Sequence, residues 1–185
     1  MKLIVGLGNP EDEANFAGTR HNMGFNTINK IAEKYDVSIS KEKFKGIYGT
    51  GTIENEKVIL LKPQTYMNLS GDCVIEYVNY YKIPVEDIIV IYDDVDIDEG
   101  KIRVRRSGSP SSHKGMISLT ERLGSIDFPR VRVGIGKPEH DIISYVIGAV
   151  PKEVLKKLDK STTIAAEAVE MIIKNGIEKA MNKYN

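Results

Sequence analysis

The sequence predicts an α/β protein, a single domain of three α/β/α layers in which helices cover both faces of a twisted mixed sheet. Segments with strand patterns alternate along the chain with segments of helical periodicity, as in α/β folds. The most apolar run, 88–92, is typical of a buried central strand. Two strand patterns, 44–53 and 57–61, are separated by a short polar turn and predict a hairpin, so the sheet should contain antiparallel as well as parallel strands.

The first elements are a strand, a loop and a helix. The apolar run 3–8 predicts a buried strand that ends in a tight turn, because its glycines allow close backbone approach. A polar loop over 11–20 follows, and apolar residues that recur on one face predict a helix over 22–35. His21 therefore stands at the junction of the loop and the helix.

A second strand-to-helix loop follows the hairpin. Pro63 ends the strand pattern, and Ser70 stands where it would cap a helix whose buried face includes Cys73. Asn68 lies on the loop between them, in the same context as His21. The remaining predicted elements are alternating strands at 101–105 and 128–136, a helix after the small-residue loop 107–112, and a last helix from Pro151 that is expected to break near Thr162 and Thr163.

The composition bounds the class of protein. A chain of 185 residues can bury one sizeable core, so we expect a single domain over 1–185. The sequence contains no run of 18 apolar residues, so no membrane span is predicted. Residues 1–5 have the pattern of a strand rather than that of a secretory signal. The one cysteine, Cys73, excludes an internal disulfide and is typical of a small buried residue. These features predict a cytoplasmic protein with no membrane partner.

Charge is balanced overall but not locally. The formal net charge is zero, which excludes a strongly basic nucleic-acid binder. An acidic block at 93–99 is followed directly by a basic stripe that can bind phosphates, because affinity follows the local patch. The acidic block could also hold Mg²⁺, although charge balance with its basic neighbours explains it more simply. The stripe consists of Lys101, Arg103, Arg105 and Arg106.

Polar side chains follow three predicted strand ends and could meet: Asn9 with His21, then Asn68, and finally Asp93. A histidine beside a carboxylate gains basicity and a fixed tautomer, with one ring nitrogen free to take a proton. An asparagine nearby can orient water or donate to a developing oxyanion. No serine or cysteine nucleophile stands out, so the base would activate water directly. This pattern points to metal-free hydrolysis of an activated acyl group.

Simpler interpretations stand beside this one. His21 could cap a helix or be solvated, Asp93 could be a turn residue, and Asn68 could be an ordinary loop residue. His113 and His140 are separated in sequence from other ligand types, which argues against zinc. The first turn begins like a dinucleotide fingerprint, but Glu11 stands in place of its third glycine, which argues against a nucleotide cofactor.

Five motifs in a fixed order resemble those of the bacterial peptidyl-tRNA hydrolase family, over nearly the whole chain. The resemblance implies hydrolysis of the ester between a peptide and the terminal ribose of tRNA. Nothing in the sequence demands a dimer or a cofactor, so we expect a monomer that works without either a cofactor or a metal. Such an enzyme would recycle tRNA from stalled translation. The motifs are Val5-Gly6-Leu7-Gly8-Asn9-Pro10, Thr19-Arg20-His21-Asn22-Met23-Gly24-Phe25, Lys62-Pro63-Gln64-Thr65-Tyr66-Met67-Asn68-Leu69-Ser70-Gly71, Asp93-Asp94-Val95-Asp96 with Gly100, and 128–136.

The resemblance also implies roles for single residues. His21 would be the general base, Asp93 its orienting carboxylate, and Asn68 the group that holds the substrate backbone and the water. Asn9 would help to select peptidyl over free aminoacyl substrates. The other implied contacts are Tyr66 and Met67 along the cleft, and Arg103, Arg105 and Arg132 on phosphates of the acceptor stem, whose CCA end carries the peptide.

The chain departs from the family pattern in two loops. The loop before His21 is two residues longer than usual and has Phe16 in place of a tyrosine, which keeps a ring for stacking but loses a hydroxyl. The family's glycine-rich loop ending in His-Asn-Gly is here Ser109-Pro110-Ser111-Ser112-His113-Lys114-Gly115. Lys114 thus replaces an asparagine near the substrate, and lysine can donate but not accept a hydrogen bond. A catalytically weak, hydrolase-like RNA-binding module is therefore the alternative function.

Overall fold

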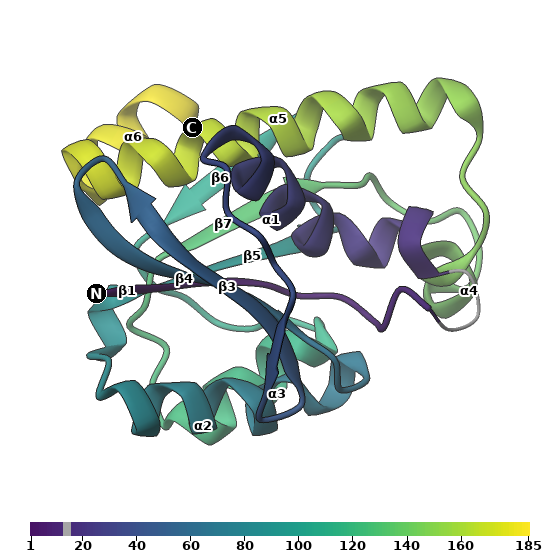
Figure 1. Ribbon diagram of the computed structural model, residues 1–185. Coiled ribbons are helices and arrows are strands. Elements are labelled where there is room, and N and C mark those ends of the chain that lie inside the picture. Colours follow the sequence, from purple (N-terminus) through teal and green to yellow (C-terminus); the bar gives the residue numbers. More distant parts are fainter. Residues whose placement is uncertain (13–15) are drawn as a thin grey trace.

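The computed structural model describes residues 1–12 and 16–185, so the middle of the predicted 11–20 loop lies outside the described part. One mixed sheet of seven strands runs through the molecule in the order β2-β3-β4-β1-β5-β7-β6 (Figure 1). The strands are β1 (Lys2–Gly6), β2 (Lys41–Lys43), β3 (Gly46–Ile53), β4 (Glu56–Pro63), β5 (Ile88–Asp94), β6 (Ile102–Arg105) and β7 (Arg130–Gly134). The helices are α1 (Met23–Lys34), α2 (Ser70–Tyr81), α3 (Lys114–Leu123), α4 (Ile142–Ile147), α5 (Lys152–Asn175) and α6 (Ile177–Tyr184).

The pairing of the strands brings four carboxyl ends to one edge of the sheet. Strand β1 pairs in parallel with β4 and β5, and β5 pairs in parallel with β7. The predicted hairpin is the antiparallel pair β3 and β4, and β6 joins β7 antiparallel at the far side. The mixed sheet is thus confirmed. Loops after β1, β4 and β5 leave from the same edge, where ligands gather in α/β folds.

Helices form layers on both faces of the sheet, as predicted. Helices α1, α5 and α6 cover one face, and α2 and α3 cover the other (Figure 1). Side chains alternate along β5, so that Ile89 and Ile91 pack with the first group of helices while Val90 and Tyr92 pack with the second. Cys73 is buried on the second face, where burial raises the pKa of its thiol to about 12, consistent with a small core residue.

Two glycines hold the start of α1 against the sheet. A Cβ atom on Gly24 would collide with backbone atoms of Leu7 and Ile91, and a Cβ on Gly6 would collide with the backbone of Gly24. Only residues without a side chain allow this approach. The 3₁₀ turn Arg20–Asn22, which precedes α1, is therefore fixed directly over the ends of β1 and β5.

Two local predictions were wrong, and one strand was missed. Helix α5 is continuous through Thr162 and Thr163, and the hydroxyls of both residues donate to the carbonyl of Asp159 within the helix. Ser70 is the first residue of α2 rather than its cap, and its hydroxyl donates to the Met67 carbonyl. Strand β2 was not predicted, since its three charged residues show no apolar alternation.

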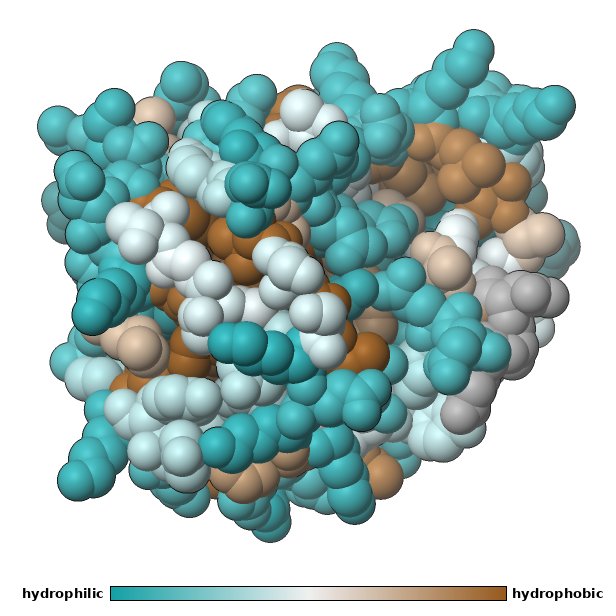
Figure 2. Space-filling model, viewed as in Figure 1, coloured by the Kyte–Doolittle hydropathy of each residue, from teal (hydrophilic) through white to brown (hydrophobic). Residues whose placement is uncertain are grey.

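Hydrophilic side chains cover most of the face seen in Figure 2, with smaller hydrophobic patches between them. Among the described residues, no helix combines the length and the apolar character needed to cross a membrane.

Arg130 is a buried structural residue, although it alternates with Arg132 along β7. Its side chain is 1% exposed, and the guanidinium donates to the carbonyls of Gly108 (2.7 Å), Ile126 (2.6 Å) and Phe128 (3.3 Å). These bonds tie β7 to the loop that leads to α3.

We expect Arg130→Met to lower the free energy of unfolding by about 3–5 kcal/mol, because the carbonyls of Gly108, Ile126 and the buried Phe128 lose the donors of a fully buried guanidinium. Urea denaturation would measure the change. Arg105 is the matched control, because it lies directly across from Arg130 on β6 but is half-buried. Arg105→Met should cost less than about 1 kcal/mol. Equal losses for the two variants would contradict a special structural role of Arg130.

Candidate active site

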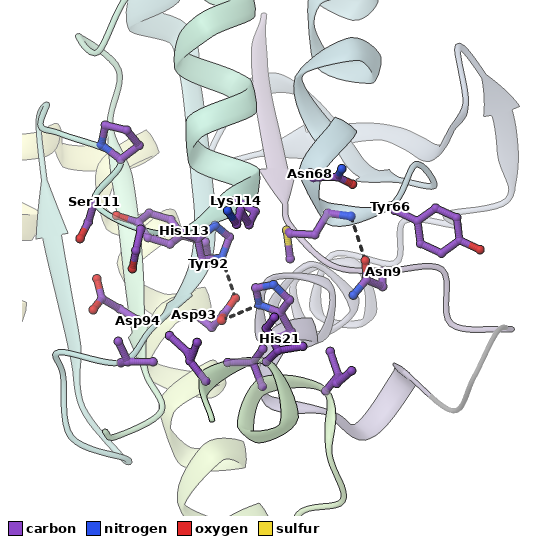
Figure 3. A pocket seen from close by; sticks show the side chains of 18 of the residues that line it. Asn9, His21, Tyr66, Asn68, Tyr92, Asp93, Asp94, Ser111, His113 and Lys114 are labelled. Carbon is purple, nitrogen blue, oxygen red and sulfur yellow. Dashed lines mark hydrogen bonds and ion pairs between the residues drawn. The ribbon is translucent and has the colours of Figure 1, made fainter. Parts of the chain in front are cut away.

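A cavity of about 290 Å³ opens at the carboxyl edge of the sheet (Figure 3). Its walls come from the loops after β1, β4 and β5, from the start of α3 and from α4. Seven of the residues singled out from the sequence line it together: Asn9, His21, Tyr66, Met67, Asn68, Asp93 and Lys114.

A histidine, an aspartate and a second histidine form the floor of the cavity. His21 Nδ1 lies 2.8 Å from Asp93 Oδ2, and His113 Nε2 lies 2.9 Å from Asp93 Oδ1 (Figure 3). The Asp93 side chain is 2% exposed, so both of its oxygens are satisfied by imidazoles rather than by bulk water. The predicted contact between His21 and Asp93 is present.

The hydrogen bonds fix the tautomers of both rings. The backbone N–H of Met116 donates to His113 Nδ1 (3.2 Å), so the His113 proton lies on Nε2 and is donated to Asp93. His21 donates its Nδ1 proton to the other carboxylate oxygen, which leaves the Nε2 lone pair of His21 free. His113 also caps α3 through the same Nδ1 atom.

Electrostatics favour a basic His21 beside an ionised Asp93. Burial alone would lower the pKa of His21, but the charge of Asp93 and the hydrogen bond to it raise the pKa above its ordinary value. Burial alone would likewise raise the pKa of Asp93, yet His21 and His113 hold the pKa of that carboxyl well below its usual range. The carboxylate therefore stays charged while the imidazole titrates.

His21, Asp93 and His113 also have the composition of a metal site, since their ligand atoms lie within 4.8 Å of one another. The fold brings His113 next to Asp93, so the interpretation that His113 is remote from other ligand types was wrong. Sequence separation hid the contact because the loop before α3 returns to the end of β5. A metal on His113 Nε2 would displace the proton that Asp93 accepts, whereas the observed hydrogen bonds already satisfy both nitrogens of His113 and both oxygens of Asp93.

Asn9 connects two walls of the cavity. Its side-chain oxygen accepts a hydrogen bond from the Met67 backbone N–H (2.8 Å), which orients its amide nitrogen. Its backbone N–H and carbonyl both bond the buried side chain of Asn22 (2.8 and 2.9 Å). The loop after β1 is thereby locked to the segment that carries Asn68, which lines the cavity with an exposed side chain.

The rim of the cavity combines polar and apolar side chains. Tyr66 and Lys114 are exposed at its edge, and Lys114 is the first residue of α3. Isoleucines of α4, with Ile143 63% exposed, form an apolar wall opposite. Arg20 holds that wall, because its guanidinium lies 4.0 Å from the ring centre of Tyr145 in α4.

The predicted phosphate-binding arginines lie outside the cavity lining, on neighbouring strands. Arg103 of β6 is directly across from Arg132 of β7, so the two side chains share one face of the sheet. Arg132 donates to Asp94 at 2.8 Å, and Asp94 lines the cavity. Phe16 also lies outside the cavity lining, in a short turn before Arg20.

Sequence reasoning missed His113, Asn22 and α4 as parts of the site. A signal for His113 existed, since it stands between a loop and a helix start, as His21 does. For Asn22 and α4 the sequence offers no comparable signal, because their places depend on tertiary packing.

Comparison with known proteins gives a consistent result. The family model for peptidyl-tRNA hydrolase matches residues 3–185. Peptidyl-tRNA hydrolases of Clostridium acetobutylicum and of Clostridium botulinum strain Okra are 51% and 52% identical over 185 residues, which cover 100% of this chain and 98% and 97% of those proteins. A crystal structure of peptidyl-tRNA hydrolase from Acinetobacter baumannii, 35% identical, superposes with a TM-score of 0.93 over 100% of this chain and 94% of that one. These full-length matches, which agree with the geometry of the site, show that the chain belongs to the peptidyl-tRNA hydrolase family.

Proposed function

We propose that this protein hydrolyses the ester bond between a peptide and tRNA, and so recycles tRNA from stalled or abortive translation. The main support for this function is the geometry of the His21 ring. Asp93 holds its Nδ1 atom at 2.8 Å, and its Nε2 atom is left free at the cavity. Membership of the family supports the choice of substrate. The enzyme works as a cytoplasmic monomer and uses neither a cofactor nor a metal.

His21 acts as the general base on water. Its Nε2 atom takes a proton as the water oxygen forms a bond to the ester carbonyl carbon. Asp93 stabilises the imidazolium that forms, because the carboxylate remains ionised. When the bond between the carbonyl carbon and the ribose oxygen breaks, the imidazolium returns the proton to that oxygen. General base catalysis of this kind contributes about 10²–10⁴-fold.

Asparagines position the reacting groups. The amide nitrogen of Asn9 is free to donate to a peptide carbonyl, because its oxygen is held by Met67. A free aminoacyl ester lacks that carbonyl, which gives a basis for preferring peptidyl substrates. Asn68 holds the substrate backbone and the water, while Tyr66 and Met67 form the adjoining wall.

The tRNA lies across strands β6 and β7. Arg103, Arg105 and Arg132 contact phosphates of the acceptor stem, and Phe16 offers a ring for stacking. Phosphate contacts do not read sequence, which suits an enzyme that must accept many tRNAs. The CCA end then reaches the cavity, where the ester meets His21.

The test is release of tRNA from N-acetyl-aminoacyl-tRNA by the purified protein, with free aminoacyl-tRNA as the control substrate. Multiple turnovers on the blocked substrate, with slower release from the free one, are expected. Salt-dependent binding of tRNA with no release even at high enzyme concentration would instead support the RNA-binding module. The exposed Lys114 at the cavity is the feature that favours this alternative.

Lys114→Asn is expected to raise kcat/KM several-fold. Lys114 lines the cavity at the first residue of α3, where its ammonium can donate but not accept a hydrogen bond. Asparagine removes the charge and can both donate and accept hydrogen bonds. Initial rates of tRNA release would measure the change, with Lys160→Asn on the exposed side of α5 as control. An unchanged rate would mean that the Lys114 ammonium points away from the reacting atoms.

A further inference from the structure

Strand β6 carries two of the proposed phosphate-binding arginines, Arg103 and Arg105, at the edge of the sheet. It is a strand of four residues at the end of the strand order, and β7 is its one partner among the described strands. Backbone groups alternate in direction along such a strand, so those of every second residue face away from the sheet. The Val104 N–H and carbonyl are the outward pair, between Arg103 and Arg105.

The side-chain amide of Asn185 closes this edge. The Val104 N–H donates to Asn185 Oδ1 (2.7 Å), and Asn185 Nδ2 donates to the Val104 carbonyl (2.8 Å). One amide thus supplies the same acceptor and donor that a neighbouring strand would supply. The backbone N–H of Asn185 donates to Met181 (3.1 Å), so the amide is fixed to the end of α6.

Helix α6 supports the same strand from one face. Ile102 and Val104 are buried against α6, where Ala180 is fully buried. Glu178 of α6 also reaches Arg106, just after β6, at 2.9 Å, although both side chains are exposed. Figure 1 shows α6 alongside β6. The side chains of Arg103 and Arg105 project from the opposite face of the sheet, because these residues pair across the strands with Arg132 and Arg130.

We propose that Asn185 is a positioning residue for the tRNA substrate. Its amide holds the edge of β6 so that Arg103 and Arg105 keep the spacing that the acceptor-stem phosphates require. Without it, β6 would have to be ordered when tRNA binds, and that ordering would weaken binding. This inference rests on the proposed contact of these arginines with phosphates. The effect falls on binding rather than on chemistry, because β7 separates β6 from the strand that carries Asp93.

The test compares Asn185→Ala and Asn185→Asp. Alanine removes both bonds, and aspartate keeps the acceptor for the Val104 N–H but puts an oxygen opposite the Val104 carbonyl. Both variants should raise KM for N-acetyl-aminoacyl-tRNA about three- to tenfold, with kcat unchanged. The slope of log KM against log salt should become shallower, because fewer phosphates are held. Hydrogen exchange at the Val104 amide should become faster.

Two controls separate positioning from other effects. Asn182→Asp adds the same charge to an exposed position of α6 and should leave KM unchanged. The N-acetyl-aminoacyl ester of a CCA trinucleotide has no acceptor stem, so its hydrolysis should not respond to either Asn185 variant. If its kcat falls together with that of the full substrate, Asn185 has only a general structural role and the proposal is overturned.

Arg103→Ala distinguishes failure of this inference from failure of the proposed function. A raised KM for Arg103→Ala, with unchanged KM and salt slope for Asn185→Ala, would overturn the role of Asn185 alone. Unchanged KM for Arg103→Ala on the full tRNA substrate would remove the phosphate contact itself, and the positioning role would be lost with it. Release from the trinucleotide substrate by the wild type tests the hydrolase activity independently of both.

Discussion

Replacing His21 by alanine is expected to lower kcat for N-acetyl-aminoacyl-tRNA by about 10²–10⁴-fold, with little change in KM. The ring is fixed with Nδ1 on Asp93, so its Nε2 lone pair is the base at the cavity floor. The side chain is 12% exposed, which lets a water molecule reach it without general solvation. Initial rates of tRNA release, measured over a range of substrate concentrations, would separate kcat from KM.

His140→Ala is the matched control for this loss. His140 is exposed and does not line the cavity, so its removal should leave kcat within twofold of the wild-type value. The His21→Ala protein should still bind tRNA with the wild-type salt dependence, because the arginines of β6 and β7 are untouched. Retention of more than a tenth of the wild-type kcat would place the base on another residue.

The sequence is sufficient to predict the parts of the site that come from strand ends. Asn9, Asn68 and Asp93 each follow an apolar strand pattern, and parallel strands in one sheet must deliver their carboxyl ends to one edge. His21 follows from the same logic, because the helix after β1 has to return across the sheet. The charged alternation of β6 and β7 likewise predicts strands and a shared basic face.

Contacts that depend on how loops return could not be read from the sequence. His113 reaches Asp93 only because the loop before α3 folds back, and Arg130 holds that loop through the Gly108 carbonyl. Arg130 and Arg132 look equivalent along the strand, yet one is buried and the other half-buried. The difference arises from neighbouring loops, which carry no periodic signal.

Asp93→Asn is expected to lower kcat by about 10²–10⁴-fold through a change of tautomer. His113 can only donate from Nε2, because its Nδ1 accepts the Met116 N–H. The asparagine must therefore turn its oxygen toward His113 and its NH₂ group toward His21. His21 then has to accept at Nδ1, which moves its own proton to Nε2 and disables the base. Nitrogen NMR of the labelled imidazoles would detect the exchange of tautomers.

The pH profile gives an independent measure of the same interaction. The base works when neutral, and the pKa of His21 is raised above its ordinary value of 6.5, so wild-type kcat/KM should rise with pH and level off only above that value. Asp93 stays ionised over this range because its pKa is depressed, so a single proton should govern the rise. In Asp93→Asn the carboxylate charge is gone, and the midpoint of the residual activity should move to lower pH. A midpoint that stays in place would show that the rise belongs to a group other than His21.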